Sequence, residues 1–436
     1  MTTAGLFDRE HRWFSIAAHR PFLDDLAWGL MRELAPAGPE ALADAVVLTP
    51  TRRAGRELQA AFLKHAGGTA LLLPQIRTLG GLDEGEPPFE TAALALDLPT
   101  AISPRRRSFE LARIALEHQD KLTERLDASS AMRMGGALGR LLESAAIEEA
   151  SLDDLAGLTD GDHAKHWQRS AGFLTAAIDS WRRRLGDLGV VDAPERQVRL
   201  LAEQWRRSPP PGVVVAAGAT GTAPAQADLL GVIAGLPQGA VVLPGLDLEA
   251  PDTVWAQIGS VEEQHPQSAL KRLLERAGIP RDAVTLWPSP ASLIEERRGR
   301  WRRRVVNEAL RPVEATADWV RAVEGLRKEG ANEGEDAAAE GLAGLAVVEA
   351  RHEGEAALVA AMLLRETLET PGATAAVVTP DAGLARRIQA ALGRWGVKAD
   401  SSAGEPLTLS PAATLCLTIA QAAARDDRTP SPCLRC

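Results

Sequence analysis

Arginines and threonines that follow expected β-strands are the side chains of this sequence best suited to bind phosphates. Arg52, Arg53 and Arg56 come shortly after one apolar run, and Thr220 and Thr222 come after another. Guanidinium and hydroxyl groups both bind phosphate oxygens, and ligands of open α/β sheets lie beyond the carboxyl ends of the strands. These residues are therefore candidate contacts to a nucleic-acid backbone. For each threonine taken alone, a cap beside a glycine turn is the favoured interpretation.

The sequence lacks both elements that an ATP-hydrolysing lobe requires. A P-loop reads GxxxxGK[ST], and no glycine of this chain precedes a lysine. Between the first expected strand and helix, His19 or Arg20 could hold an anion at the helix N-terminus, although an exposed loop end is the favoured interpretation. The strand that would end in a magnesium-binding acid has Ala217 there instead. We therefore expect no catalytic residue and no ATP hydrolysis in this part of the chain.

Three further arginine clusters each admit two interpretations. Arginines surround Trp301 between positions 297 and 304, and the runs 105–107 and 182–184 are similar, the latter beside Trp181. Guanidinium groups for phosphates and an indole for base stacking would suit a nucleic acid. A solvated helix face with its tryptophan in the core fits the same pattern, so both interpretations stay open.

The composition is that of an ordinary folded protein. The 436 residues are 45% hydrophobic, and the net charge of −10 argues mildly against a nucleic-acid-binding protein, although local patches can override it. Cysteine occurs only at positions 416, 433 and 436, so we expect no disulfide framework and no metal site. His163 and His166 do not suggest zinc. No apolar span of roughly 18 residues and no signal peptide is present, so the expected location is the cytoplasm.

Apolar runs that alternate with amphipathic helices predict a parallel sheet covered by helices. The expected strands are Trp13–Ile16, Ala45–Leu48, Leu71–Leu73, Val213–Val215 and Val241–Leu243. The strand, Thr-Pro turn and helix that begin near Val46 are echoed from Ala376 onward, including an arginine pair in each helix. Two related α/β lobes are the design of a two-lobed helicase motor.

The expected fold class is therefore α/β, with parallel-sheet lobes and an inserted all-helical subdomain. The first lobe comprises 1–104 and 208–311, and the helical subdomain is 105–207. A flexible linker rich in Gly, Ala and Glu is expected at 312–340. Residues 341–436 are expected to form the start of a second α/β lobe, which is truncated.

Four segments, taken in order, resemble the B subunits of AddAB helicase–nucleases in their alphaproteobacterial form. They are VVLTPTRRAGRELQAAFL, LLLPQIRTLGGLDE, VVVAAGATGTAPAQADLLGVIAGLPQGAVVLPGLD and AAVVTPDAGLARRIQAALGRWGVKADSSAGEPL. The resemblance implies a helicase-like region with RecA-like parallel-sheet lobes of the superfamily 1 type. This region would work with the AddA subunit on double-stranded DNA ends. It also implies a role in guiding unwound single-stranded DNA and in recognising a recombination hotspot. ATP and magnesium are then expected on AddA, and no cofactor is expected in this chain.

The resemblance also assigns roles to single positions. Arg52 and Arg53 stand where such helicases contact the DNA backbone, and Ala217 stands where better-preserved B subunits have an acid. Arg386 and Arg387 belong to the start of the second motor-like lobe. Family members continue into a nuclease domain that this sequence lacks. We hypothesise that the tail at 429–436 is a frameshifted or truncated end, which would make its Cys-x-x-Cys an artefact.

The favoured function is that of a DNA-repair subunit that binds DNA and no longer drives a motor. One alternative is an active ATP-dependent helicase or nuclease, which would need a P-loop or clustered carboxylates. Another is a dinucleotide or nucleotide-sugar enzyme using Gly218 and Gly221, but GATG lacks the full GxGxxG pattern. A protein-interaction scaffold without DNA contact is the third alternative.

Overall fold

In the computed structural model the chain forms two compact units, Met1–Ala343 and Gly344–Cys436, which we describe separately. The residues that the structure describes are 5–79, 100–122, 125–147, 164–192, 203, 205–207, 212–222, 224–259, 264–290, 293–334, 336–402, 404 and 407–424. His163 and the tail at 429–436 lie outside these residues. None of the described helices has the length and apolar character needed to span a bilayer.

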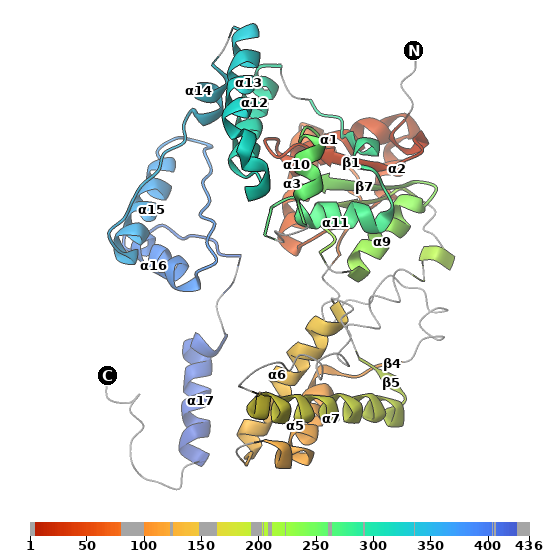
Figure 1. Cartoon of the computed structure of the whole chain (residues 1–436), viewed down its shortest axis with the longest axis vertical. Helices are drawn as coiled ribbons and strands as arrows, with labels where there is room; N and C mark the ends of the chain where they lie inside the picture. Colours follow the sequence, from red (N-terminus) through yellow and green to blue (C-terminus); the bar gives the residue numbers. More distant parts are fainter. Residues whose placement is uncertain are drawn as a thin grey trace. The chain divides into compact units, whose positions relative to one another are not determined.

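A wholly parallel sheet of six strands lies at the centre of the first unit (Figure 1). Its strands are β1 (Trp13–Ile16), β2 (Val46–Thr49), β3 (Gln75–Thr78), β6 (Val214–Ala217), β7 (Gly239–Pro244) and β8 (Thr285–Leu286). Their spatial order is β3-β2-β6-β7-β1-β8, with Val46 beside Val214 and Trp13 beside Val241. This mixed α/β arrangement is consistent with a RecA-like α/β fold.

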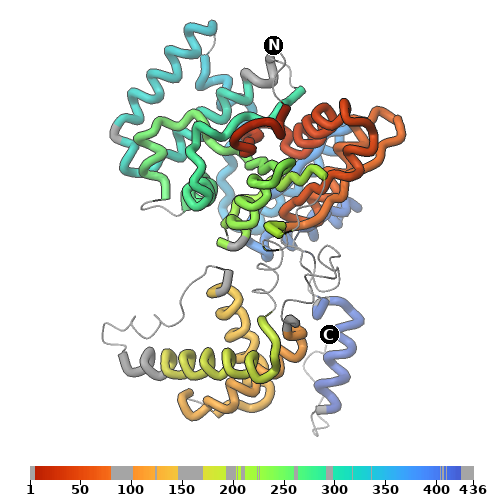
Figure 2. The backbone as a smooth tube through the Cα atoms, turned by 90° about the vertical axis from the view of Figure 1, so that its right-hand side faces the viewer, coloured from red at the N-terminus to blue at the C-terminus, as the bar shows by residue number. Residues whose placement is uncertain are grey.

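Helices cover both faces of the sheet, which explains why the inner strands are apolar without alternation. On one face, α1 (Phe22–Leu34) and α3 (Arg52–Ala66) pack against Val47, Val215 and Val242 (Figure 2). On the other, α9 (Pro224–Gly235) and α11 (Ser268–Ala277) pack against Val46, Val214 and Val241. Successive valines of one strand therefore enter opposite cores, as the two-residue period of a strand requires.

Two strand predictions differ from the structure. The apolar Leu71–Leu73 segment is not a strand but packs as irregular chain against the core, and β3 begins after it at Gln75. β8 was not expected, because only two residues pair and the signal of a strand that short is lost among its neighbours. The remaining short elements are α2 (Pro39–Ala43), α10 (Asp252–Gln257), η1 (Leu6–Asp8), η2 (Ala35–Ala37), η3 (Gln119–Lys121), η5 (Arg281–Ala283) and η7 (Leu407–Leu409).

The residues that the structure describes between β3 and β6 are mainly helical. They include α5 (Pro104–Glu117), α6 (Ala128–Ile147) and α7 (Ala164–Leu188), packed around a core of their own. α5 and α6 approach closely at Gly135, which has no side chain to separate them. A Cβ at that position would lie 2.7 Å from the backbone N of Ala112. The subdomain is not purely helical, since β4 (Thr100–Ala101) and β5 (Val190–Val191) form a short parallel pair.

The flexible linker expected at 312–340 is wrong, because this region is helical. The chain continues from α12 (Leu293–Ala309) through η6 (Val313–Asp318) into α13 (Trp319–Asn332) and α14 (Ala337–Leu342). These helices share a small core in which Trp301, Leu326 and Ala337 are buried. Alanine, glutamate and leucine are strong helix formers, so the composition that suggested a linker also suits helices once they have a tryptophan to pack on.

The second unit contains α15 (Glu353–Thr367), α16 (Ala382–Gly393) and α17 (Pro411–Ala424). α15 and α16 pack through Ala361, Ile388 and Leu392. The described residues of this unit include no strand, so the repeat of the first lobe is reproduced in its helix but not in the run that ends at Thr379. Val378 in that run is 96% exposed, so its side chain is not packed in a core.

Candidate nucleic-acid interface

The loops that follow β1, β2, β6 and β7 meet at one edge of the sheet. All strands are parallel, so their carboxyl ends lie on the same side. Two glycines with positive φ record how closely the loops approach. A Cβ at Gly218, after β6, would lie 3.4 Å from both Phe22 and Pro50, and one at Gly245, after β7, would lie 3.0 Å from Ala18. Segments far apart in the sequence thus form one surface, which we call the carboxyl edge.

The loop after β1 is closed by an ion pair of its own. Arg20 Nε lies 2.5 Å from Asp25 Oδ2 and Arg20 Nη2 lies 3.0 Å from Asp25 Oδ1, so the contact is bidentate. The two side chains are only 10% and 1% exposed. Paired guanidinium and carboxylate groups in this geometry form strong, directional hydrogen bonds. Arg20 is therefore directed at α1, and an anion bound here would have to compete with a buried carboxylate.

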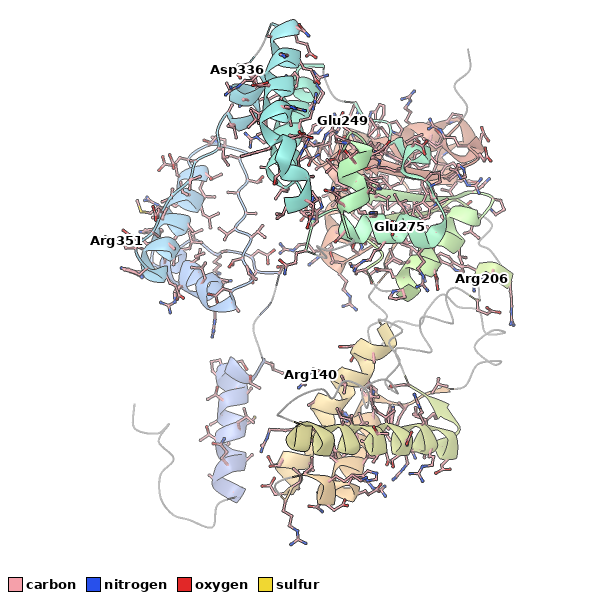
Figure 3. All side chains as sticks on the ribbon, viewed as in Figure 1. Arg140, Arg206, Glu249, Glu275, Asp336 and Arg351 are labelled. Atoms are coloured by element: carbon pink, nitrogen blue, oxygen red, sulfur yellow. The ribbon has the colours of Figure 1, made fainter. Side chains whose placement is uncertain are left out.

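His19, the other candidate anion-binding residue of this loop, is covered by α12. A Cβ at Gly299 would lie 2.0 Å from His19 Cδ2, so only glycine permits the helix to pass this close. Two further contacts hold α12 at the carboxyl edge. Asn307 Nδ2 donates to Asp247 Oδ2 at 2.7 Å, and Arg303 Nη2 lies 2.5 Å from Glu249 Oε1. Figure 3 labels Glu249 beside the helices of this region. α12 therefore packs on the loops after β1 and β7.

Ala217 ends β6 and contributes no ligand atom. It is 1% exposed and lies beside Val242 in the neighbouring strand. The next residue, Gly218, donates its N–H to the Val242 carbonyl at 2.9 Å, so the backbone there is also committed to the sheet. Magnesium requires oxygen ligands, usually carboxylates, and a methyl side chain supplies none. At the end of β6, the carboxyl edge is therefore formed by a packed methyl group and paired backbone rather than by a polar side chain.

Arg52, Arg53 and Arg56 lie in the first turns of α3, directly after β2, and all three are exposed. The helix start is defined by Thr51, whose side chain accepts a hydrogen bond from the Ala54 N–H at 3.1 Å. The helix N-terminus itself favours anions, because its free N–H groups and the helix dipole present positive charge. The structure thus brings the predicted arginines to the carboxyl edge, at a point suited to a phosphate.

Thr220 and Thr222 lie in the loop after β6, where Thr220 is half-buried and Thr222 is exposed. Gly221 between them has φ +60°, and a Cβ there would lie 2.7 Å from Leu273 Cδ1, so glycine is required on both grounds. Gly221 therefore fixes the course of this loop against α11. The loop belongs to the same edge as the arginines of α3, because Gly218 contacts Pro50 in the turn before them.

The arginines around Trp301 are largely committed to the protein. Trp301 is fully buried, Arg300 pairs with Glu333 at 2.6 Å, and Arg304 pairs with Glu329. The hydrogen bond from Arg304 lowers the pKa of the Glu329 carboxyl, although burial acts in the opposite direction. Arg302 donates to backbone carbonyls in and just after α14. Of the two interpretations of this cluster, the structure supports the packed tryptophan with paired arginines.

Arg386 and Arg387 lie on α16 in the second unit. Arg386 Nε donates to the Ala382 carbonyl at 3.2 Å within its own helix. Arg387 lies 3.3 Å from Glu353 of α15, and both side chains are more than half exposed. An exposed pair of this kind contributes little to stability. The two arginines thus lie on the surface of α16, in a unit separate from the carboxyl edge.

Comparison with known proteins adds no family to this picture. No protein-family model matches the sequence, and no curated protein matches it either. Among the described residues, no group of three or more His, Cys, Asp or Glu side chains is placed to hold a metal ion. The function must therefore be argued from the carboxyl edge itself.

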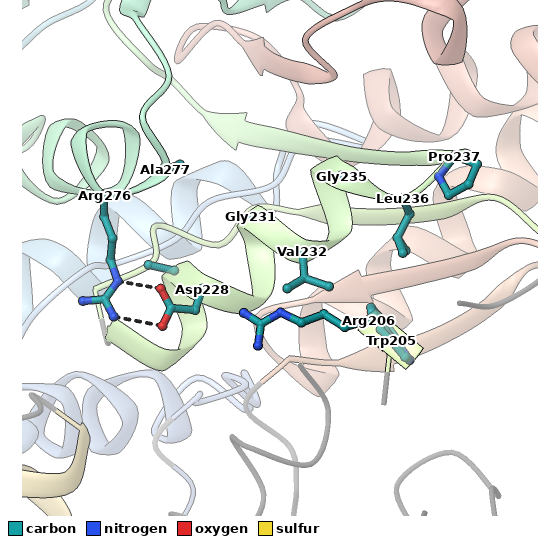
Figure 4. A pocket seen from close by; sticks show the side chains of 11 residues that line it. Trp205, Arg206, Asp228, Gly231, Val232, Gly235, Leu236, Pro237, Arg276 and Ala277 are labelled. Carbon is teal, nitrogen blue, oxygen red and sulfur yellow. Dashed lines mark hydrogen bonds and ion pairs between the residues drawn. The ribbon is translucent and has the colours of Figure 1, made fainter. Parts of the chain in front are cut away.

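A separate cavity of about 600 Å³, which no sequence motif indicated, lies along α9 (Figure 4). It is lined by residues of α9 and α11 together with Trp205 and Arg206. Arg276 and Asp228 form a bidentate pair at its margin, with Nε–Oδ1 and Nη2–Oδ2 distances of 2.6 and 2.9 Å. This hydrogen bonding lowers the pKa of the Asp228 carboxyl. The cavity depends on how two helices pack, which local sequence patterns do not encode.

Proposed function

We propose that this chain is the non-motor subunit of a helicase–nuclease complex for DNA double-strand break repair and recombination. In this proposal it binds and guides unwound DNA beside an AddA-type motor subunit. One observation carries the proposal: exposed arginines lie at the carboxyl edge while the positions that would hold a nucleotide phosphate there are filled by protein. The resemblance to AddAB B subunits supplies the partner and the DNA substrate.

The proposal extends the α/β fold to a helicase-like one of superfamily 1. The parallel sheet and the helices that follow its third strand are compatible with that assignment. In it, β1 and β6 correspond to the strands that carry the P-loop and the hydrolytic acid of an active motor. The Arg20–Asp25 pair and Ala217 then mark the loss of both phosphate-handling elements.

The proposed mechanism is one of binding and guidance rather than catalysis. Arg52, Arg53 and Arg56 contact successive phosphates of one DNA strand, together with the N–H groups of the α3 N-terminus. The Thr222 hydroxyl, in the loop after the neighbouring strand β6, is a further candidate contact. Such contacts fix the path of a strand without reading its sequence. The energy for strand movement comes from ATP hydrolysis on the motor subunit, and this chain keeps the separated strand on its course.

Replacing Arg52, Arg53 and Arg56 together with glutamine is expected to weaken the binding of single-stranded DNA. Each phosphate contact releases counterions, so the slope of log affinity against log salt should fall in magnitude by about 0.7 per lost contact. The loss of three contacts therefore predicts a slope smaller by about 2. Fluorescence anisotropy with a labelled oligonucleotide at several salt concentrations measures both the affinity and the slope.

The control removes the same charge from a different surface. Arg321, Arg327 and Lys328 are exposed on α13. Their replacement with glutamine should leave the slope nearly unchanged, because only general attraction is reduced. An equal change of slope in the two triple variants would contradict a DNA site at the carboxyl edge. DNA binding that is absent or independent of salt would favour the protein-interaction scaffold.

A further inference from the structure

One face of α5 presents an aromatic ring among arginines to the solvent. Phe109 is 62% exposed, which is unusual for so large an apolar side chain. Arg105 precedes it by one helical turn and Arg113 follows it by one, and Arg106 lies on the same side. Arg105 and Arg106 are exposed, and the Arg113 side chain is 61% exposed. We call these four residues the α5 stripe.

Neighbouring arginines of the same subdomain behave differently, which sets the stripe apart. Arg107 is largely buried and forms a bidentate pair with Asp192, with distances of 2.7 and 3.1 Å. Arg184 pairs with both Glu110 and Glu117 at 2.9 Å. Such pairs hold the helices together. In the part of the chain that the structure describes, no ion pair holds Arg105 or Arg106.

Trp181, the aromatic residue that lies beside the arginine run 182–184, has a structural role. Trp181 is 3% exposed, and its Nε1–H donates to Asp192 Oδ2 at 3.3 Å. Trp181 is therefore part of the subdomain core and is not available to stack on a base. Phe109, which composition and spacing did not single out, is the exposed ring beside the arginine run.

We propose that the α5 stripe is a second contact for single-stranded nucleic acid, with Phe109 stacking on a base and the flanking arginines binding phosphates. Aromatic rings between cationic groups are the usual means of binding single strands without regard to sequence. Phe109 lies about 6 Å along the helix from Arg105 and from Arg113, so one ring and its flanking charges form a continuous strip. The proposal rests on the proposed function only in taking DNA as the ligand.

The carboxylates near the stripe are compatible with an anionic ligand. Glu110 Oε2 lies 3.6 Å from the nearest Arg113 nitrogen, but the same oxygen accepts a hydrogen bond from Arg184 at 2.9 Å. Glu117 is likewise bonded to Arg184. Arg184 therefore offsets part of the negative charge of these two acids from the α7 side. Arg113, more than half exposed, is free to turn toward a phosphate.

The test is the affinity of the full chain for a labelled oligo(dT), measured over a range of salt concentrations. Phe109→Ala should weaken binding about tenfold with little change of salt slope, because stacking does not release counterions. Arg113→Gln should weaken binding and reduce the magnitude of the slope by about 0.7. Phe109→Trp should retain or increase the affinity. Met132→Ala, which truncates an exposed apolar residue on α6, should change neither quantity.

The outcomes separate this inference from the proposed function. Binding that is lost in the Arg52, Arg53 and Arg56 triple variant but unchanged by Phe109→Ala overturns the α5 site and leaves the carboxyl edge intact. Weaker DNA binding in Phe109→Ala, together with wild-type affinity in Phe109→Trp, supports the α5 site. If wild-type protein binds no oligo(dT), both are overturned. Phe109→Ala could instead leave DNA binding unchanged and weaken binding to the motor subunit. That result would show that the α5 stripe is a protein contact and would contradict the proposal.

Discussion

Replacing Trp301 with alanine is expected to lower the free energy of unfolding by about 3–5 kcal/mol. Trp301 is fully buried and is the largest side chain in the core formed by α12, α13 and α14. Leu326, Ala337 and Val305 pack against it, and none of them is large enough to fill the space an indole leaves. The three helices should consequently loosen together, including the contacts of α12 with the carboxyl edge.

Urea unfolding followed by circular dichroism measures the stability, and hydrogen–deuterium exchange over 293–342 shows where protection is lost. Trp319→Ala is the matched control, because Trp319 lies in the adjoining helix α13 but is 48% exposed. That variant should lose well under half as much stability. Equal losses in the two variants, or full retention of protection in α12–α14 with Trp301→Ala, would contradict the packing described here.

Asp25→Asn should produce the second large effect, a loss of about 3–5 kcal/mol. The substitution keeps the size of the side chain but removes the charge opposite Arg20, whose side chain is only 10% exposed. A buried guanidinium without its carboxylate keeps its desolvation cost and loses the attraction that offset it. The loop after β1 should then lose the geometry that directs Arg20 at α1.

Chemical denaturation of Asp25→Asn beside Asp24→Asn checks this prediction. Asp24 pairs with Lys64 at 3.0 Å, but the lysine side chain is 69% exposed, so that pair should contribute little. A double variant with Arg20→Met and Asp25→Leu should recover much of the lost stability, because neither charge then remains buried. An Asp25→Asn protein as stable as wild type would show that the pair does not close the loop.

The strands of the first unit were the most predictable feature of the sequence. Trp13–Ile16 was expected and observed with the same bounds, and Val241–Leu243 lies within β7. Parallel strands buried on both faces are uninterrupted apolar runs, which local sequence shows directly. Leu71–Leu73 is just as apolar but packs without pairing, because the position of an edge strand depends on its neighbour's hydrogen bonds as well as on hydrophobicity.

The helices α13 and α14 show the limit of compositional inference. Their glycine, alanine and glutamate content is shared by flexible linkers and by surface helices. Burial of Trp301 by Leu326 and Ala337 decides between the two, and it depends on residues well separated in the sequence. For the expected second sheet, the sequence pattern was present but the strand was not observed. The apolar run that ends at Thr379 precedes a helix, yet it pairs with no strand among the described residues.

The candidate site was predictable in its position but not in its surroundings. The residues after β1, β2 and β6 had to meet at one edge once the sheet was parallel, so Arg20, Arg52 and Thr220 could be grouped from sequence alone. The approach of Gly299 to His19 joins opposite ends of the first unit and has no local signal. The exposure of Phe109 and the burial of Trp181 likewise depend on how α5, α6 and α7 pack.

A chain whose carboxyl edge binds DNA and does not run on ATP should bind a single strand without hydrolysing nucleotide. The most direct measurement is ATP turnover by the purified chain with magnesium at low salt, in the presence of enough single-stranded DNA to saturate it. We expect the DNA to be bound and turnover to stay at the level of a protein-free control. Turnover that rises with protein concentration and is stimulated by DNA would contradict it.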